Sequence, residues 1–207
     1  MRRVVPGDAD PLGPRGVSVG LRNECMTVPL ELRTPRLWLR RWHPADRAPF
    51  AALNADPRVM EYFASTLSRE ESDSVVERIQ NHFAQHGFGL WAVEIPDETD
   101  FAGFIGLFHC SFEAHFTPAV EIGWRLAAPH WNRGYATEGA LAAMSFGFHE
   151  LQLDQIVSLT AVGNMRSRRV MEKIGMIRDP EDDFDHPNLP IGHPLRRHVL
   201  YKTKRMT

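Results

Sequence analysis

Strand and helix signals alternate along most of this chain, and this alternation constrains the fold more than any other feature. Runs with strand character fall at residues 36–42, 90–95, 104–110, 119–126, 155–161 and 198–202. Runs with helical spacing or capping residues fall at 44–54, 68–87, 134–150 and 165–174. The order predicts an α/β or α+β fold with one mixed sheet flanked by helices. Within it, the run 36–42 alternates apolar and basic residues, which predicts a strand with one face in water.

The first 28 residues differ from the rest of the chain. They are rich in proline and glycine and show no sustained hydrophobic period. Such a segment has too little apolar surface to offset the entropy lost on ordering. We therefore expect a disordered tail over residues 1–28 and a single folded domain over residues 29–207.

Composition excludes several classes of protein. Apolar residues make up 43% and charged residues 24% of the chain, as in ordinary globular domains. The formal net charge of −2 argues against a nucleic-acid partner. No signal peptide or membrane-spanning run is apparent, and two cysteines are too few for a disulfide scaffold. We expect a cytoplasmic protein without a membrane partner, and we leave a homodimer open.

A glycine-bearing turn joins the strand at 119–126 to an alanine-rich helix that begins at Gly134. The first amides of a helix have no intrahelical acceptor, and the helix dipole adds positive charge there. The segment Arg133–Thr137 can therefore bind a pyrophosphate through its backbone N–H groups. A tight structural turn would contain the same glycine, so both interpretations stand on this segment alone.

A second segment begins at Asn164, directly after the strand at 155–161. Asn164 can cap the following helix, whose spacing places Ser167, Met171 and Ile174 on one side. An ordinary capped helix that ends at Gly175 explains the same pattern.

Together, in this order, the two segments resemble the acetyl-CoA-binding motifs of the GNAT N-acetyltransferase superfamily. The turn Trp131–Ala136 matches the family pattern at Gly134 and Ala136 but departs from it at Trp131. A tryptophan there, followed by Gly-Tyr-Ala-Thr-Glu, is similar to the ribosomal-protein N-acetyltransferases, the RimJ/RimL-like branch. Other parts share the likeness: Leu32–Leu37, Glu121–Trp124, Asn164, Ser167 and Lys173. The resemblance covers about residues 32–176.

The resemblance implies a GNAT fold, whose mostly antiparallel mixed sheet is splayed between its fourth and fifth strands, here 119–126 and 155–161. It implies acetyl-CoA as co-substrate and direct transfer of the acetyl group to a neutral amine. A backbone N–H near Gly123 or Trp124 would face the thioester carbonyl. The residues that the resemblance assigns to acetyl-CoA are Trp124, Leu126, Arg133, Gly134, Tyr135, Ala136, Thr137, Asn164 and Ser167.

Two residues are candidates for catalysis. Glu121 lies at the end of its strand nearest the splay, where a carboxylate can take a proton directly or through water. A structural salt bridge with Arg125 or Arg133 is the alternative. Many GNAT enzymes protonate the leaving thiolate with a tyrosine, but the matching position is Met171. The resemblance places Ser167 near the sulfur instead, with helix packing as its alternative role.

An acidic run and ten histidines remain. The carboxylates between Asp179 and Asp185 either attract a cationic amine or form an exposed charge run. The spacing of His186, His193 and His198 matches no zinc pattern, so we predict no metal.

We therefore predict an acetyl-CoA-dependent N-acetyltransferase, with a protein N-terminal α-amine as the first choice of acceptor. An enzyme acting on a small-molecule or antibiotic amine is the alternative. A non-catalytic acyl-CoA-binding module is the competing hypothesis from another class.

Overall fold

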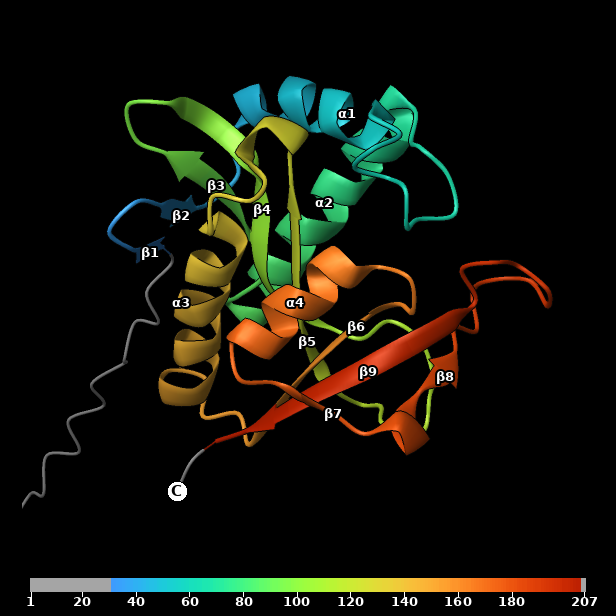
Figure 1. Cartoon of the computed structure of the whole chain (residues 1–207). Helices are drawn as coiled ribbons and strands as arrows, with labels where there is room; N and C mark the ends of the chain where they lie inside the picture. Colours follow the sequence, from blue (N-terminus) through green and yellow to red (C-terminus); the bar gives the residue numbers. More distant parts are fainter. Residues whose placement is uncertain (1–30, 206–207) are drawn as a thin grey trace, which may run out of the picture.

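A computed structural model describes residues 31–205, which form one nine-stranded sheet with helices packed against it (Figure 1). The strands are β1 (Leu32–Arg33), β2 (Trp38–Arg40), β3 (Leu90–Ile95), β4 (Thr99–His109), β5 (Val120–Leu126), β6 (Gln155–Ala161), β7 (Ile177–Arg178), β8 (Phe184–Asp185) and β9 (Arg197–Lys204). The α-helices are α1 (Arg47–Ala55), α2 (Arg69–His86), α3 (Tyr135–His149) and α4 (Met165–Lys173). Three short 3₁₀ turns lie at Pro44–Asp46, Ala128–His130 and Pro180–Asp182.

The sheet order is β1-β2-β3-β4-β5-β6-β9-β7, with β8 paired to β9. Only β5 and β6 run parallel, and every other neighbouring pair is antiparallel. The predicted mixed, mostly antiparallel sheet is therefore confirmed. Figure 1 shows α1 beside α2 and α3 beside α4, and both helix pairs are in contact.

The two faces of the sheet can be followed along β4, because successive strand residues point to opposite sides. Ile105 and Leu107 lie under Gly139 and Gly147 of α3. Phe104 instead contacts Phe50 of α1, with ring centroids 6.0 Å apart. The same two faces continue onto β5, because Glu121 pairs with Phe108 and Arg125 pairs with Phe104 in the β4–β5 register. Glu121 and Arg125 therefore lie on the face that packs against α1.

Local signals predicted most element ends well. Ser68 and Glu71 form both hydrogen bonds of the predicted capping box at the start of α2, and Gly87 ends the helix in the left-handed region at φ 77°. The strand at 155–161 matches β6. The structure adds β1, β7 and β8, each two residues long and too short for a periodic signal, and begins β4 five residues early at Thr99.

The expectation of a water-exposed basic face on the run 36–42 is wrong at Arg40. This side chain is buried, with 2% exposed. Its guanidinium donates two hydrogen bonds to Asp46, at 2.8 and 2.9 Å, one to Glu94 at 2.8 Å and one to the Asp100 carbonyl at 2.6 Å. Two carboxylates, Asp46 just after the strand and Glu94 on the neighbouring strand β3, thus allow a basic residue to face inward.

The tail expected over residues 1–28 lies outside the described residues, and so does Cys25. The single domain expected over residues 29–207 stays a prediction, and residues 31–205 form one sheet with its helices. Among these described residues, no helix has the length and apolar character needed to cross a membrane.

We predict that Asp46→Ala lowers the free energy of unfolding by about 3 kcal/mol, because it leaves the buried Arg40 guanidinium undercompensated. Urea denaturation followed by circular dichroism measures the loss. Asp154→Ala is the matched control, since the Asp154 side chain is 93% exposed in its pair with Arg205. Equal stability of the Asp46→Ala variant and the parent would contradict the role given to this pair.

Candidate active site

The strands β5 and β6 part almost as soon as they meet. Their register contains a single pair, Glu121 with Val157. One further link lies next to it, where the Ser158 hydroxyl donates to the Ile122 carbonyl at 2.9 Å. From Gly123 onward β5 stays paired with β4 on its other edge. A Cβ built on Gly123 would meet no atom within 4 Å, so open space lies over the sheet face at Gly123, the face that Glu121 and Arg125 share.

This gap opens into a cleft of about 780 Å³. The cleft is lined by β5, the turn before α3, β6 and α4. Nine of the residues predicted from the sequence lie on its wall: Glu121, Trp124, Leu126, Gly134, Tyr135, Ala136, Thr137, Asn164 and Ser167. The structure therefore brings together residues that are more than 40 positions apart in the sequence.

The turn before α3 has the backbone conformation that anion binding requires. Gly134 is the N-cap residue at φ 84°, where a side chain would be strained, and Asn132 also has a positive φ of 59°. The first amides of α3 begin directly after Gly134 and lie on the cleft wall. This arrangement fits a pyrophosphate.

Side-chain hydrogen bonds from Thr34 and Arg36 hold this turn in place, and the sequence alone did not reveal them. The Arg36 guanidinium donates to the Arg133 carbonyl at 3.0 Å and to Glu138 of α3 at 2.7 Å. Glu138 also accepts a 2.6 Å hydrogen bond from the Thr34 hydroxyl. The likeness at Leu32–Leu37 was visible, but its role depends on contacts with residues about 100 positions away.

The Arg133 side chain does not line the cleft. Its guanidinium pairs with Glu98, with a 2.9 Å hydrogen bond, and lies 4.9 Å from the Tyr135 ring centroid. Only the Arg133 backbone remains a candidate for contact with phosphate. The same pair removes Arg133 as a salt-bridge partner of Glu121, and Arg125 donates to Asn54 instead, at 2.6 Å.

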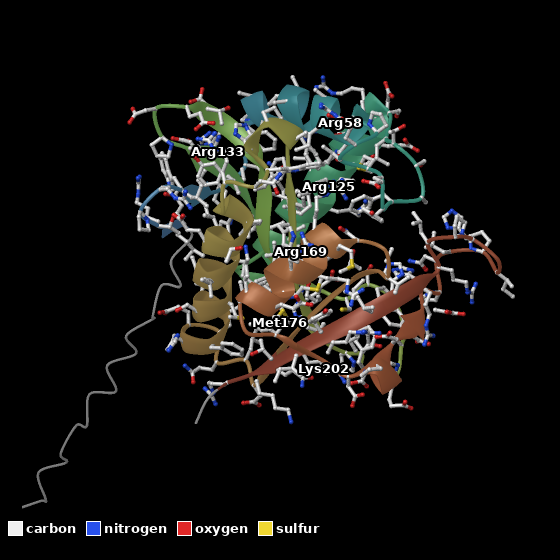
Figure 2. The ribbon with its side chains drawn as sticks, in the orientation of Figure 1. Arg58, Arg125, Arg133, Arg169, Met176 and Lys202 are labelled. Atoms are coloured by element: carbon white, nitrogen blue, oxygen red, sulfur yellow. The ribbon has the colours of Figure 1, made fainter. Side chains whose placement is uncertain are left out.

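Three of the cations that line the cleft come from α4. The side chains of Arg166, Arg169 and Lys173 lie along its wall. Arg166 pairs with Glu61 and lies 4.6 Å from the Trp131 ring centroid. Within residues 31–205, no ion pair forms at Arg169 or Lys173. Figure 2 shows Arg169 on α4 and Arg133 near the start of α3. Unpaired cations beside a helix N-terminus fit the phosphates of coenzyme A.

Glu121 is half-buried on the cleft wall, on the same sheet face as α1 and α2. Loss of hydration raises its pKa to about 7. Burial, followed by the charge of Glu121, raises the pKa of the neighbouring Cys110 thiol to about 12. Cys110 is therefore no thiolate at neutral pH, and the described residues favour direct transfer over a cysteine-bound intermediate.

Ser167 is oriented by the residue that caps its helix. Asn164 Oδ1 accepts from the Ser167 N–H at 3.2 Å, and Asn164 Nδ2 donates to the Ser167 hydroxyl at 3.1 Å. Because the serine oxygen already accepts, its own proton is available to donate into the cleft. Met171 lies on the same wall, buried with 1% exposed, and offers no proton.

Arg125 is the cation on the α1 and α2 side of the cleft (Figure 2). Its guanidinium lies 4.0 Å from the Phe63 ring centroid, and its Nε is buried without a hydrogen-bond partner among residues 31–205. Burial lowers the pKa of Arg125 to about 10, so it stays protonated at neutral pH. No carboxylate of the described chain neutralises it.

The acidic segment is not a free anionic surface. Asp182 accepts from Lys202 at 2.8 Å, Asp183 pairs with Arg178, and Asp185 pairs with Arg196 at 3.3 Å. These pairs leave little net negative charge to attract a cationic amine.

The cleft between parting strands, the phosphate-binding turn and the oriented polar groups together define a protein that binds an acyl-coenzyme A. Residues 36–177 match the family model described as an acetyltransferase (GNAT) domain. The chain belongs to this GNAT acetyltransferase family.

Similar proteins agree with this assignment. An uncharacterized protein of Bacillus subtilis, YkkB, is 34% identical over 152 residues, which are 73% of this chain and 87% of the relative. An acetyltransferase of the GNAT family from Bacillus anthracis superposes with a TM-score of 0.69 at 28% identity, covering 84% of this chain and 98% of that structure. The chain is therefore an acetyl-CoA-dependent acetyltransferase, and its acceptor is an amine.

Two relatives have more specific names. The FsC-acetyl coenzyme A-N(2)-transacetylase of Aspergillus fumigatus is 30% identical over 152 residues, 70% of this chain and 64% of the relative. The putative ribosomal N-acetyltransferase YdaF of Bacillus subtilis is 34% identical over 60 residues, 29% of this chain and 33% of the relative.

We predict that Arg169→Ala raises the KM for acetyl-CoA roughly tenfold while kcat changes little, because a cation on the cleft wall that binds the donor's phosphates would contribute equally in ground and transition states. Steady-state kinetics with varied acetyl-CoA measures the split. Lys204→Ala, on the exposed end of β9, is the matched control. A fall in kcat at unchanged KM would show that Arg169 acts on the reaction step instead.

Proposed function

We propose that this protein acetylates the N-terminal α-amine of a protein or peptide, as the RimJ/RimL-like branch does, with Glu121 as general base. The observation that carries the proposal is the carboxyl of Glu121 beside the gap between β5 and β6, with a pKa of about 7. Such a carboxyl is ionised in a large fraction of molecules at neutral pH and still basic enough to take a proton.

The two faces of the sheet suggest how donor and acceptor meet. The turn before α3 and the wall of α4 favour the donor's phosphates, and the unpaired edge of β5 suits the amide-bearing pantetheine arm. Glu121 and Arg125 lie on the opposite face, toward α1 and α2. The acceptor amine would enter from that face and reach the thioester through the gap.

Each catalytic group then has one task. Glu121 takes the proton from the ammonium form of the acceptor, so that the amine lone pair can attack the thioester carbonyl. A backbone N–H of Gly123 or Trp124 stabilises the oxyanion that results. The Ser167 hydroxyl, fixed by Asn164, donates a hydrogen bond to the sulfur as the C–S bond breaks. The second proton of the attacking nitrogen passes through solvent to the leaving thiolate, so the products are the amide and the coenzyme A thiol, and Glu121 returns its proton to solvent.

The pKa of Glu121 favours an α-amine over a lysine side chain. An α-ammonium has a pKa near 8, so transfer of its proton to a base of pKa 7 is uphill by about 1.4 kcal/mol. A lysine ammonium has a pKa near 10.4, and the same transfer costs about 5 kcal/mol. The local likeness to the putative ribosomal N-acetyltransferase supports the same choice.

A small-molecule amine is the second candidate, because the Aspergillus relative is named for an N(2) acceptor. Polyamines and aminoglycosides fit less well than neutral or anionic acceptors. The acidic segment is occupied by internal ion pairs, and the Arg125 guanidinium repels further positive charge.

Release of free thiol from acetyl-CoA tests the acceptor class. The panel contains peptides with free N-termini, the same peptides with blocked N-termini but a lysine, and small polycations. We expect turnover on the free N-termini only. Turnover confined to small amines would support the second candidate, and acetyl-CoA binding without turnover on any amine would favour the binding module.

We predict that Glu121→Gln lowers kcat/KM by about 10²- to 10⁴-fold at pH 8 without changing acetyl-CoA affinity. In the parent, kcat/KM falls as pH drops through about 7, because protonated Glu121 cannot act as a base. A second ionisation in the pH profile belongs to the acceptor amine and follows its pKa. Profiles measured with two acceptors of different basicity therefore distinguish the ionisation of the acceptor from that of Glu121. Glu121→Gln removes only the first ionisation. A parent-like pH profile in this variant would contradict the proposed base.

A further inference from the structure

Three imidazole rings meet outside the active-site cleft. His82 and His86 lie on the last turns of α2, and His109 is the final residue of β4. One ring nitrogen from each lies within 4.8 Å of the others. The ring centroids are 4.5 Å apart for His82 and His86, and again for His86 and His109.

The fold creates this cluster from residues distant in sequence. His82 and His86 are separated by one helical turn and therefore lie on the same side of α2. His109 is 27 residues beyond His82 and reaches the cluster because β4 ends there. Local spacing along the sequence does not reveal this cluster, because its third histidine lies on another element.

His82 is held as a metal-binding histidine would be. Its Nδ1 lies 2.8 Å from the Phe88 carbonyl, which fixes that nitrogen as the N–H donor. Its Nε2 is left as an acceptor: it accepts a hydrogen bond from the His109 backbone N–H at 3.2 Å and lies 3.0 Å from Nδ1 of His109. Histidines that bind metals are commonly oriented by a backbone carbonyl in this way. The His82 ring also stacks on Phe108, with centroids 4.1 Å apart, so it cannot easily turn away.

We propose that His82, His86 and His109 form a site for a divalent transition metal of the Zn²⁺ class, with water as the fourth ligand. Tetrahedral coordination at Zn–N distances of about 2.1 Å separates the nitrogens by about 3.4 Å. The His82–His109 separation of 3.0 Å is near that value, and the exposed side chain of His86 closes the third position by rotation. Magnesium and calcium are excluded, because they require oxygen ligands and this cluster offers none.

Metal binding replaces the two hydrogen bonds that His82 Nε2 accepts, from Nδ1 and from the backbone N–H of His109, with metal–nitrogen bonds, and the freed backbone N–H turns to the water ligand. The proton on Nδ1 of His109 moves through solvent to Nε2 of the same ring, so the exchange releases no net proton. The metal then ties the end of α2 to the end of β4. Phe108 lies between this site and the cleft, since it stacks on His82, lines the cleft and pairs with Glu121 in the sheet. The site therefore stabilises the wall that supports Glu121 and takes no part in acetyl transfer itself.

The test uses the untagged full chain, treated with a chelator and dialysed. Competition with a chromophoric chelator measures Zn²⁺ affinity and stoichiometry, and Co²⁺ reports the geometry through the visible bands of its four-coordinate form. We expect one equivalent of Zn²⁺, four-coordinate Co²⁺ bands and a rise in Tm of about 5 °C or more at a hundredfold excess over Kd.

Variants locate the metal. His86→Ala and His109→Ala each lower Zn²⁺ affinity more than about tenfold and abolish the rise in Tm. His86 is exposed, so this variant keeps its fold even if the other does not. His149→Ala, at the exposed end of α3, is the matched control and binds as the parent does. If His86→Ala bound Zn²⁺ as tightly as the parent does, the proposal would be overturned. The absence of four-coordinate Co²⁺ bands in the parent would also overturn it.

Discussion

The separation of β5 from β6 is the constraint on which the rest of the structure depends. A parallel pair of seven-residue strands would normally form a ladder along its length, but here only Glu121 and Val157 are paired. The fold tolerates the unpaired edge of β5 because this edge borders a cleft. There a bound amide-bearing chain can pair with the free backbone N–H and C=O groups of β5. The same separation places the end of β5 between the two helix layers, so that groups from both faces of the sheet reach one point.

Charged groups in this protein divide into those satisfied by the fold and those left for a ligand. Arg40 has two carboxylates and a carbonyl as partners and lies in the core as a structural element. Arg125 has one amide oxygen, and Glu121 has no ion pair in the described part of the chain. Incomplete compensation is costly in a folded protein, and it is concentrated on the wall of the cleft. The raised pKa of Glu121 and the lowered pKa of Arg125 result from this burial without a partner of opposite charge.

Local sequence signals predicted the longer elements, and the family likeness named nine residues that line the cleft. The capping residues of α2 and α4, the glycine before α3 and the alternation of β6 each act within a few residues, so they could be recognised without a structure. What the sequence could not provide were the pairings between distant residues. The sequence pattern predicts Arg40 in water and Arg133 at the cleft, and it allows the acidic run to attract cationic amines. In each case the deciding partner lies on another element: Asp46, Glu98 and Lys202.

A crystal structure of the protein with coenzyme A would show whether the gap between β5 and β6 is the donor site. We expect the pantetheine arm to lie between β5 and β6 and to hydrogen-bond the free edge of β5 beyond Gly123. We also expect the pyrophosphate to contact the first amides of α3 and the sulfur to lie within about 3.5 Å of the Ser167 hydroxyl. Coenzyme A bound on another surface, or a sulfur remote from both Ser167 and Glu121, would contradict this placement of the donor.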